Sequence, residues 1–177
     1  MLRILFLTLI FSFPAFAGQQ DNTKVEGSTQ QIDWGKHWAG PEVKAPADLE
    51  GKVTLLVIWG GCPGCKSLTP GMVSFAKSLE GQPFHLIASY CQRGTKENAL
   101  ASLKAYKWNE KMTNTSVMYQ TDFPTAPVEY VPYYLIFDHT GKLRYNHMAG
   151  VYHGGDGNNY QKLVKKLLKE VPEGDLR

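Results

Sequence analysis

Two of the three cysteines in the chain lie close together, in the stretch Cys62-Pro63-Gly64-Cys65. Paired cysteines at this spacing can bind a metal, close a loop or carry electrons as a dithiol. A structural zinc site needs four ligands, and the sequence has no second cysteine pair to supply them. A disulfide across two residues closes so small a loop that it adds little stability. The spacing therefore favours redox chemistry.

The cysteine pair lies at a predicted junction between a strand and a helix. Residues 53–59 form a continuous apolar and β-branched run, which is typical of a strand buried on both faces. Residues 66–79 then place apolar side chains at helical spacing. The sites of α/β proteins lie at such junctions, where strands end and helices begin. This context supports redox catalysis by the pair.

The order of residues in the motif assigns different roles to its two thiols. If Cys62 is the N-cap of the helix, Pro63 takes the first helical position, where its missing N–H costs nothing. The N–H groups of Gly64 and Cys65 then point toward the Cys62 sulfur and stabilise its thiolate. We expect Cys62 to attack a disulfide and the less exposed Cys65 to resolve the mixed disulfide.

The rest of the apolar pattern predicts further strands and helices in alternation. These are a strand over 84–89, a helix capped by Thr95, a hairpin of strands over 133–137 and 143–148, and an amphipathic helix over 160–171. We predict an α/β fold with a central mixed β-sheet and helices on both faces.

The N-terminus predicts export from the cytoplasm. A positive start is followed by an apolar run over 4–13 and by a small-x-small pattern that ends at Ala17. We expect residues 1–17 to be a signal peptide cleaved after Ala17, which places the mature protein in a periplasm or outside the cell. The alternative, an uncleaved anchor, is disfavoured because an apolar run that covers residues 4–13 is too short to span a bilayer comfortably. Residues 18–45 are expected to be a flexible leader and connector, and 46–177 a single domain.

The charge balance excludes two classes of partner. The formal net charge is +3, and removal of Arg3 with the signal peptide lowers it to +2 (3 minus 1). A nearly neutral chain predicts neither nucleic acid nor an anionic membrane as partner. We expect a monomer that needs no metal and no cofactor beyond its own thiols.

Several spaced motifs resemble the thioredoxin-like TlpA/ResA thiol-disulfide oxidoreductases. Residues 48–56 read Asp-Leu-Glu-Gly-Lys-Val-Thr-Leu-Leu, and Trp59 and the cysteine pair with a following lysine come next. This order is similar to the family's Asp-Leu-x-Gly-Lys approach, apolar strand, tryptophan and active-site cysteines. Pro70 matches the proline that kinks the family's active-site helix. The resemblance covers about residues 46 to 170, and it makes 46–177 a thioredoxin-like domain.

The resemblance also implies a docking edge and a set of partners. Tyr130-Val131-Pro132 ahead of the strand over 133–137 is similar to the family's cis-proline strand, where the Val131 backbone would meet an extended substrate. With Cys62 and Cys65 as the catalytic residues, the implied substrate-binding residues are Trp59, Pro63, Gly64, Val131 and Pro132. The implied partners are protein or small-molecule disulfides and dithiols, and a membrane-bound electron donor that makes the protein a reductase.

The chain departs from the family pattern at two places. Only Gly60 and Gly61 separate Trp59 from the first cysteine, where the family has three residues and the last is usually tryptophan. Leu56 and Val57 stand where relatives often place Asn or a buried Asp. No carboxylate can therefore be named as the acceptor of the proton from the resolving thiol.

Two further questions stay open from the sequence. Cys62, Cys65 and His153 could hold copper, because soft thiolates with an imidazole suit that metal; copper-carrying thioredoxin-fold proteins usually have three residues between the cysteines. Cys91 follows the strand over 84–89, so it falls at the same sheet edge as the pair. It is either an accessory thiol of the site or an inert, half-buried side chain that packs as a small hydrophobe.

Overall fold

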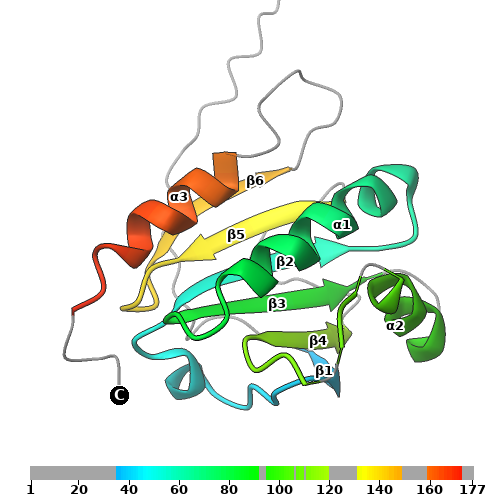
Figure 1. The fold of residues 1–177 in the computed structure, drawn as a ribbon, viewed down its shortest axis with the longest axis horizontal. Coiled ribbons are helices and arrows are strands. Elements are labelled where there is room, and N and C mark those ends of the chain that lie inside the picture. Colours follow the sequence, from blue (N-terminus) through cyan, green and yellow to red (C-terminus); the bar gives the residue numbers. More distant parts are fainter. Residues whose placement is uncertain are drawn as a thin grey trace, which may run out of the picture.

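The computed structural model describes residues 35–91, 95–105, 107–109, 111–119, 131–148 and 159–172. Within these ranges the strands form one sheet in the order β1-β4-β3-β2-β5-β6 (Figure 1). The elements are β1 (Lys36–Ala39), the 3₁₀ helix η2 (Pro46–Leu49), β2 (Val53–Trp59), α1 (Pro63–Ser78), β3 (Phe84–Tyr90), α2 (Lys96–Lys104), β4 (Thr115–Tyr119), β5 (Tyr133–Phe137), β6 (Leu143–Met148) and α3 (Asn159–Leu168). β2, β3 and β4 are parallel, and the other pairings are antiparallel. The predicted mixed sheet is confirmed.

The α-helices gather on one face of the sheet. Buried side chains of all three share one core with alternate residues of β2; those of the helices include Met72, Val73, Phe75, Ala99, Leu103, Val164 and Leu167. Both parallel connections step across the sheet in the same direction, from β2 to β3 to β4, so right-handed crossovers put α1 and α2 on the same side. On the opposite face, Leu56 and Ile58 are covered by Val43 and Leu49. Among the described residues, the helix on that second face is the short η2.

The sheet starts ahead of residue 46, where the domain was expected to begin. β1 pairs with β4 as an edge strand. Its Trp38 is 8% exposed, stacks on Tyr119 with ring centroids 4.7 Å apart, and lies 5.8 Å from the Tyr90 ring. The expected connector over 18–45 therefore contributes a strand, held by aromatic packing. The signal peptide and the rest of the leader lie outside the described residues.

Most predicted elements keep their predicted limits. β2, β5 and β6 have the predicted bounds, and β3 continues one residue further, to Tyr90. The Thr95 side chain caps α2 by accepting a hydrogen bond from the Asn98 N–H at 3.3 Å. β1 and β4 are the strands that the sequence pattern did not predict.

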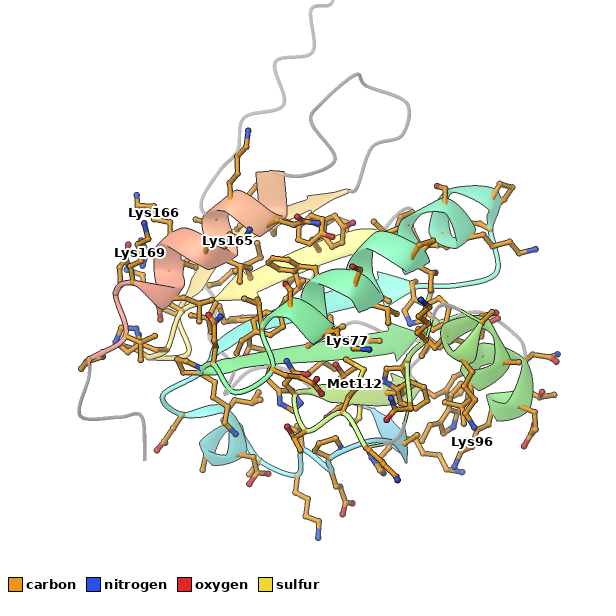
Figure 2. The ribbon with its side chains drawn as sticks, in the orientation of Figure 1. Lys77, Lys96, Met112, Lys165, Lys166 and Lys169 are labelled. Carbon is orange, nitrogen blue, oxygen red and sulfur yellow. The ribbon has the colours of Figure 1, made fainter. Side chains whose placement is uncertain are left out.

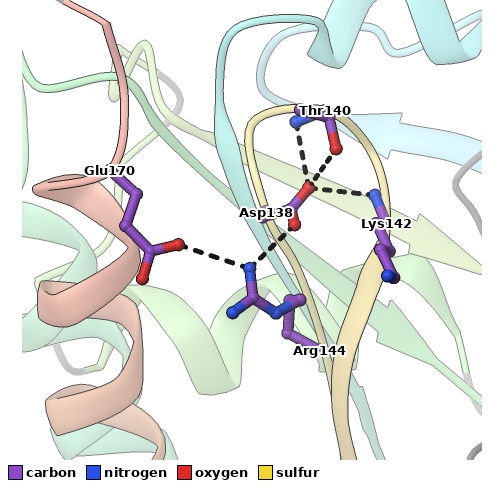
Figure 3. Close-up of polar contacts among 5 residues, drawn as sticks. All are labelled: Asp138, Thr140, Lys142, Arg144 and Glu170. Atoms are coloured by element: carbon purple, nitrogen blue, oxygen red, sulfur yellow. Dashed lines mark hydrogen bonds and ion pairs between the residues drawn. The ribbon is translucent and has the colours of Figure 1, made fainter.

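A polar network ties the β5–β6 turn to the end of α3 (Figure 3). The Asp138 carboxylate accepts hydrogen bonds from the Thr140 N–H and hydroxyl at 3.0 and 2.6 Å and from the Lys142 N–H at 3.1 Å. Arg144 pairs with Asp138 at 3.0 Å and with Glu170 at 3.3 Å. Burial of Asp138 raises the pKa of its carboxyl group, but the hydrogen bonds outweigh it and hold the pKa below its usual value. The network fixes the hairpin against the C-terminal helix.

The amphipathic character predicted for the C-terminal helix is confirmed. Val164 and Leu167 are fully buried, whereas the side chains of Lys165, Lys166 and Lys169 are exposed. Lys166, in α3, and Lys169, directly after it, lie on the outer side of the helix (Figure 2). Among the described residues, no helix has the length and apolar character needed to cross a membrane.

Candidate active site

Cys62 caps the N-terminus of α1, as predicted. Its backbone is extended, with φ −64° and ψ 155°, and Pro63 occupies the first helical position. The Cys62 sulfur accepts a hydrogen bond from the Cys65 N–H at 3.2 Å. This N–H lies in the first turn, where helix N–H groups have no partner within the helix and the helix dipole is positive. The arrangement stabilises negative charge on the Cys62 sulfur.

The two thiols of the pair differ in access to solvent. Cys62 is half-buried, and Cys65 is 1% exposed in the core beneath α1. Neither is in a disulfide, so the structure represents the dithiol form. A thiol at the surface and a thiol behind it match the expected division between an attacking and a resolving cysteine.

The predicted docking edge lies beside Cys62. The Val131–Pro132 peptide bond is cis, and the Cys62 thiol lies 3.7 Å from the Val131 carbonyl oxygen. Gly64 faces the same proline, because a Cβ added there would be 3.7 Å from Pro132 Cδ. Segments far apart in the sequence thus bring Cys62, Gly64, Val131 and Pro132 together.

Trp59 lies under the site rather than on its surface. Its side chain is 2% exposed and meets the Tyr90 ring edge-on, with centroids 5.1 Å apart. The Trp59 side chain is therefore packed beneath the cysteine pair, and its place among the substrate-binding residues stays a prediction. Pro63, in contrast, is exposed at the start of α1.

The resolving thiol is held in its protonated form. Burial raises the pKa of Cys65 to about 12, and the hydrogen bond to Cys62 adds to the rise, whereas the Gly60 N–H opposes it. Glu50, the acid nearest to the pair in the preceding sequence, follows η2, on the other face of the sheet. Among the described residues, the group found to oppose protonation of Cys65 is therefore a backbone N–H rather than a carboxylate.

Cys91 has contacts that sequence reasoning could not assign. It is half-buried at the end of β3, where both its N–H and its thiol donate to the Trp59 carbonyl, at 3.0 and 3.4 Å. Burial raises the pKa of the Cys91 thiol to about 11. The parallel register of β2 and β3, with Trp59 opposite Tyr90, sets this contact.

Of the three residues proposed to hold copper, the structure describes Cys62 and Cys65. His153 lies outside the described residues. Within the part of the chain that the structure describes, no group of three or more His, Cys, Asp or Glu side chains is arranged to hold a metal ion.

Solved structures share this architecture. A thioredoxin-like protein in its oxidized form is 22% identical, with a TM-score of 0.66, covering 84% of this chain and 99% of that one. A secreted thiol-disulfide isomerase from Corynebacterium glutamicum is 15% identical, with a TM-score of 0.62 and coverages of 92% and 98%. A putative thiol:disulfide interchange protein DsbE from Chlorobium tepidum is 17% identical, with a TM-score of 0.61 and coverages of 81% and 97%.

These likenesses define the class of the protein by its fold. No protein-family model matches the chain, and no curated protein matches it in sequence. The chain has a thioredoxin fold, and the predicted resemblance to the thioredoxin-like TlpA/ResA group is confirmed at the level of this fold.

Proposed function

We propose that this chain is an exported thiol-disulfide oxidoreductase that reduces protein disulfides with Cys62 and Cys65. One observation carries the proposal: the half-buried Cys62 sulfur accepts the Cys65 N–H at the start of α1 and lies beside the Val131 carbonyl. Structural neighbours described as a secreted isomerase and an interchange protein support the class of reaction and the export.

The first step forms a mixed disulfide. The Cys62 thiolate attacks one sulfur of the substrate disulfide, a new S–S bond forms, and the other substrate sulfur leaves as a thiolate that takes a proton from solvent. The helix N-terminus stabilises the attacking thiolate before this step. An extended substrate segment would lie along the Val131 backbone, with Gly64 and Pro132 close to the scissile bond.

The second step releases the reduced substrate. Cys65 loses its proton and attacks the Cys62 sulfur, which expels the second substrate thiolate and leaves a Cys62–Cys65 disulfide. Two electrons have then passed from the protein to the substrate. Because burial raises the pKa of Cys65 to about 12, deprotonation of Cys65 is the demanding part of the cycle.

The reducing direction follows from the modest stabilisation of the Cys62 thiolate. A strong oxidant over-stabilises its thiolate, often through charged or histidine neighbours. The residues between the cysteines offer only backbone groups, and one N–H to the Cys62 sulfur is found. We therefore expect a potential nearer to roughly −270 mV than to about −120 mV. A membrane-bound donor would return the pair to its dithiol form.

Export implies that the N-terminus of the chain is processed on the way to its compartment. Residues 1–17 act as a signal peptide cleaved after Ala17, the following residues up to β1 as a leader, and 46–177 with the preceding edge strand as the thioredoxin-like domain of a monomer. N-terminal sequencing of the exported protein tests the cleavage site, and light scattering tests the monomer.

Insulin reduction with dithiothreitol tests the activity. Wild type should accelerate precipitation of the insulin B chain, and Cys62→Ser should abolish the acceleration. Ser74→Ala, on the exposed face of α1, is the matched control and should behave as wild type. Absence of activity together with tight Cu(I) binding by the reduced protein would replace the reductase with a copper carrier.

Equilibration with glutathione tests the direction. A reductase should hold its Cys62–Cys65 pair as a disulfide in a mildly oxidising glutathione buffer, because its potential is low. A pair that remains fully reduced in that buffer would identify an oxidant or isomerase instead.

A further inference from the structure

One peptide group connects two of the three thiols. The Trp59 carbonyl accepts hydrogen bonds from the N–H and the thiol of Cys91, at 3.0 and 3.4 Å. The N–H of the same peptide group belongs to Gly60 and acts on the Cys65 sulfur. The carbonyl and N–H of a trans peptide point in opposite directions, so Cys91 and Cys65 flank this group from its two sides.

The two thiols also lie in different packing layers. Cys65 belongs to the core between the sheet and the α-helices. Cys91 packs against the core on the opposite face, which contains Ile58 and Ile87. The end of β2 therefore lies between the two sulfurs, which argues against direct exchange between them. An influence of Cys91 on Cys65 runs through the peptide group.

The Trp59–Gly60 peptide group affects Cys65 in a site where no acidic side chain has been assigned to it. The β2 positions where a buried acid could stand are Leu56 and Val57, both apolar and buried. The Gly60 N–H is then the backbone group that favours the Cys65 thiolate against burial. Gly60 is followed by Gly61, and two successive glycines leave the backbone free to rotate. The N–H stays directed at the sulfur only if another contact holds the peptide plane.

We propose that Cys91 is a positioning residue for Cys65: its thiol holds the Trp59–Gly60 peptide group so that the Gly60 N–H remains directed at the Cys65 sulfur. This inference rests on the proposed function, since it concerns the resolving step. The second hydrogen bond to the carbonyl restricts rotation of the peptide plane and polarises the group, which strengthens its N–H as a donor. Because the pKa of Cys91 is about 11, its thiol remains protonated and able to donate at neutral pH.

Reaction with dithionitrobenzoate separates the two steps of the cycle. Cys62 attacks the reagent and releases one thionitrobenzoate, leaving a mixed disulfide at Cys62. Cys65 then attacks the Cys62 sulfur and expels the second thionitrobenzoate. The reagent is held at one equivalent, so that none remains for Cys91, and the second phase of absorbance reports Cys65. Stopped-flow records at several pH values between 7 and 9, with mass spectrometry of the adduct, give both rates.

Three substitutions of Cys91 discriminate the possible roles. Cys91→Ala and Cys91→Val, which lack a donor, should slow the second phase about threefold and leave the first unchanged. A thiol is a weak donor, so the effect is smaller than the roughly tenfold of a whole hydrogen bond to a charged group. Cys91→Ser keeps a donor and should retain the wild-type rate. Cys91→Val fills the space of the thiol and separates this role from packing.

The outcomes are distinct from those that test the proposed function. If Cys62 gives no first phase, the proposed function is wrong. If the first phase is normal and all three variants keep the wild-type second phase, the positioning role is wrong. If Cys91→Ser is as slow as Cys91→Ala, the sulfur itself is needed, and the role assigned to the hydrogen bond is overturned.

Discussion

Alkylation of the reduced protein near pH 8 should rank the three cysteines by their environments. Burial raises the pKa of Cys65 from 9.0 to about 12 and that of Cys91 from 9.0 to about 11. Each pKa unit lowers the thiolate fraction tenfold, so Cys65 has about 1,000-fold and Cys91 about 100-fold less thiolate than an unperturbed thiol. Cys62 is half-buried and accepts the Cys65 N–H, so it should react first.

The thiolate fraction is partly offset by nucleophilicity. A more basic thiolate reacts faster, by a factor of about 10 to the power 0.4–0.5 for each pKa unit. This recovers about 20-fold for Cys65 and about 8-fold for Cys91, which leaves them roughly 50-fold and 12-fold slower than an unperturbed thiol. Cys65 is also only 1% exposed, so access slows it further. The expected order is Cys62, then Cys91, then Cys65.

A pulse of iodoacetamide followed by a second, isotopically distinct label after denaturation measures the three rates by peptide mass spectrometry. The same pulse in urea gives the reference, because all three thiols are then solvated. The rates of Cys65 and Cys91 should rise tenfold for each pH unit from 7 to 9, since both thiols remain below their pKa values. Labelling of Cys65 ahead of Cys62, or a plateau in its rate within this range, would refute the assignment of attacking and resolving thiols.

Three further predictions concern stability and the docking edge. Gly64→Ala should raise the free energy of unfolding by about 0.5 kcal/mol in urea, because Gly64 is helical, and its methyl group, 3.7 Å from Pro132 Cδ, should change substrate preference; a loss of stability would contradict the local geometry. Burial lowers the pKa of His85 from 6.5 to about 4, so the unfolded chain binds a proton first and stability should fall by about 3 kcal/mol as the pH drops from 6.5 to 4; His85→Gln should remove most of this dependence in urea titrations. Asp138→Asn should cost about 2 kcal/mol at pH 7, because it leaves the buried turn without the charge that pairs with Arg144; an unchanged melting temperature would show that the network does not stabilise the hairpin.

The elements that carry the active site could be predicted because their signals are local. The buried strand β2 is a run of apolar residues that any parallel sheet would cover on both faces. The cap at Cys62 follows from the proline after it, since the first position of a helix is the one that proline favours. These two signals place the attacking thiol without knowledge of any distant contact.

The edge of the sheet could not be predicted because its stability depends on distant partners. β4 begins with Thr115 and Ser116, polar residues that are nevertheless buried. Ser116 donates to the Pro41 carbonyl and is hydrogen-bonded to His85 at 2.7 Å, and both partners lie far away in the sequence. β1 has four residues, and Trp38 holds it against the aromatic rings of neighbouring strands. No periodicity along the chain reports such contacts.

The hydrogen bond of Cys91 to the Trp59 carbonyl could not be predicted from the sequence. The place of Cys91 after β3 was visible in the sequence, but its partner depends on the register of β2 and β3, which pairs Trp59 with Tyr90. A register shifted by one residue would turn the contact away from the Trp59 carbonyl. The register is fixed by the burial of both strands, so the same apolar side chains that build the core also determine which peptide group lies between two thiols.

Among the residues that the structure describes, the groups found to favour the two thiolates are backbone N–H groups. The Cys62 sulfur accepts the Cys65 N–H at 3.2 Å, and the Gly60 N–H acts to lower the pKa of Cys65 against the effect of burial. Backbone N–H groups do not titrate. The stabilisation that they give to each thiolate therefore does not change with pH as long as the fold is intact. A buried carboxylate would instead impose its own pKa on the reaction. The rate of the resolving step should then follow deprotonation of Cys65 alone, rising with pH without the additional inflection that a titrating general base would produce.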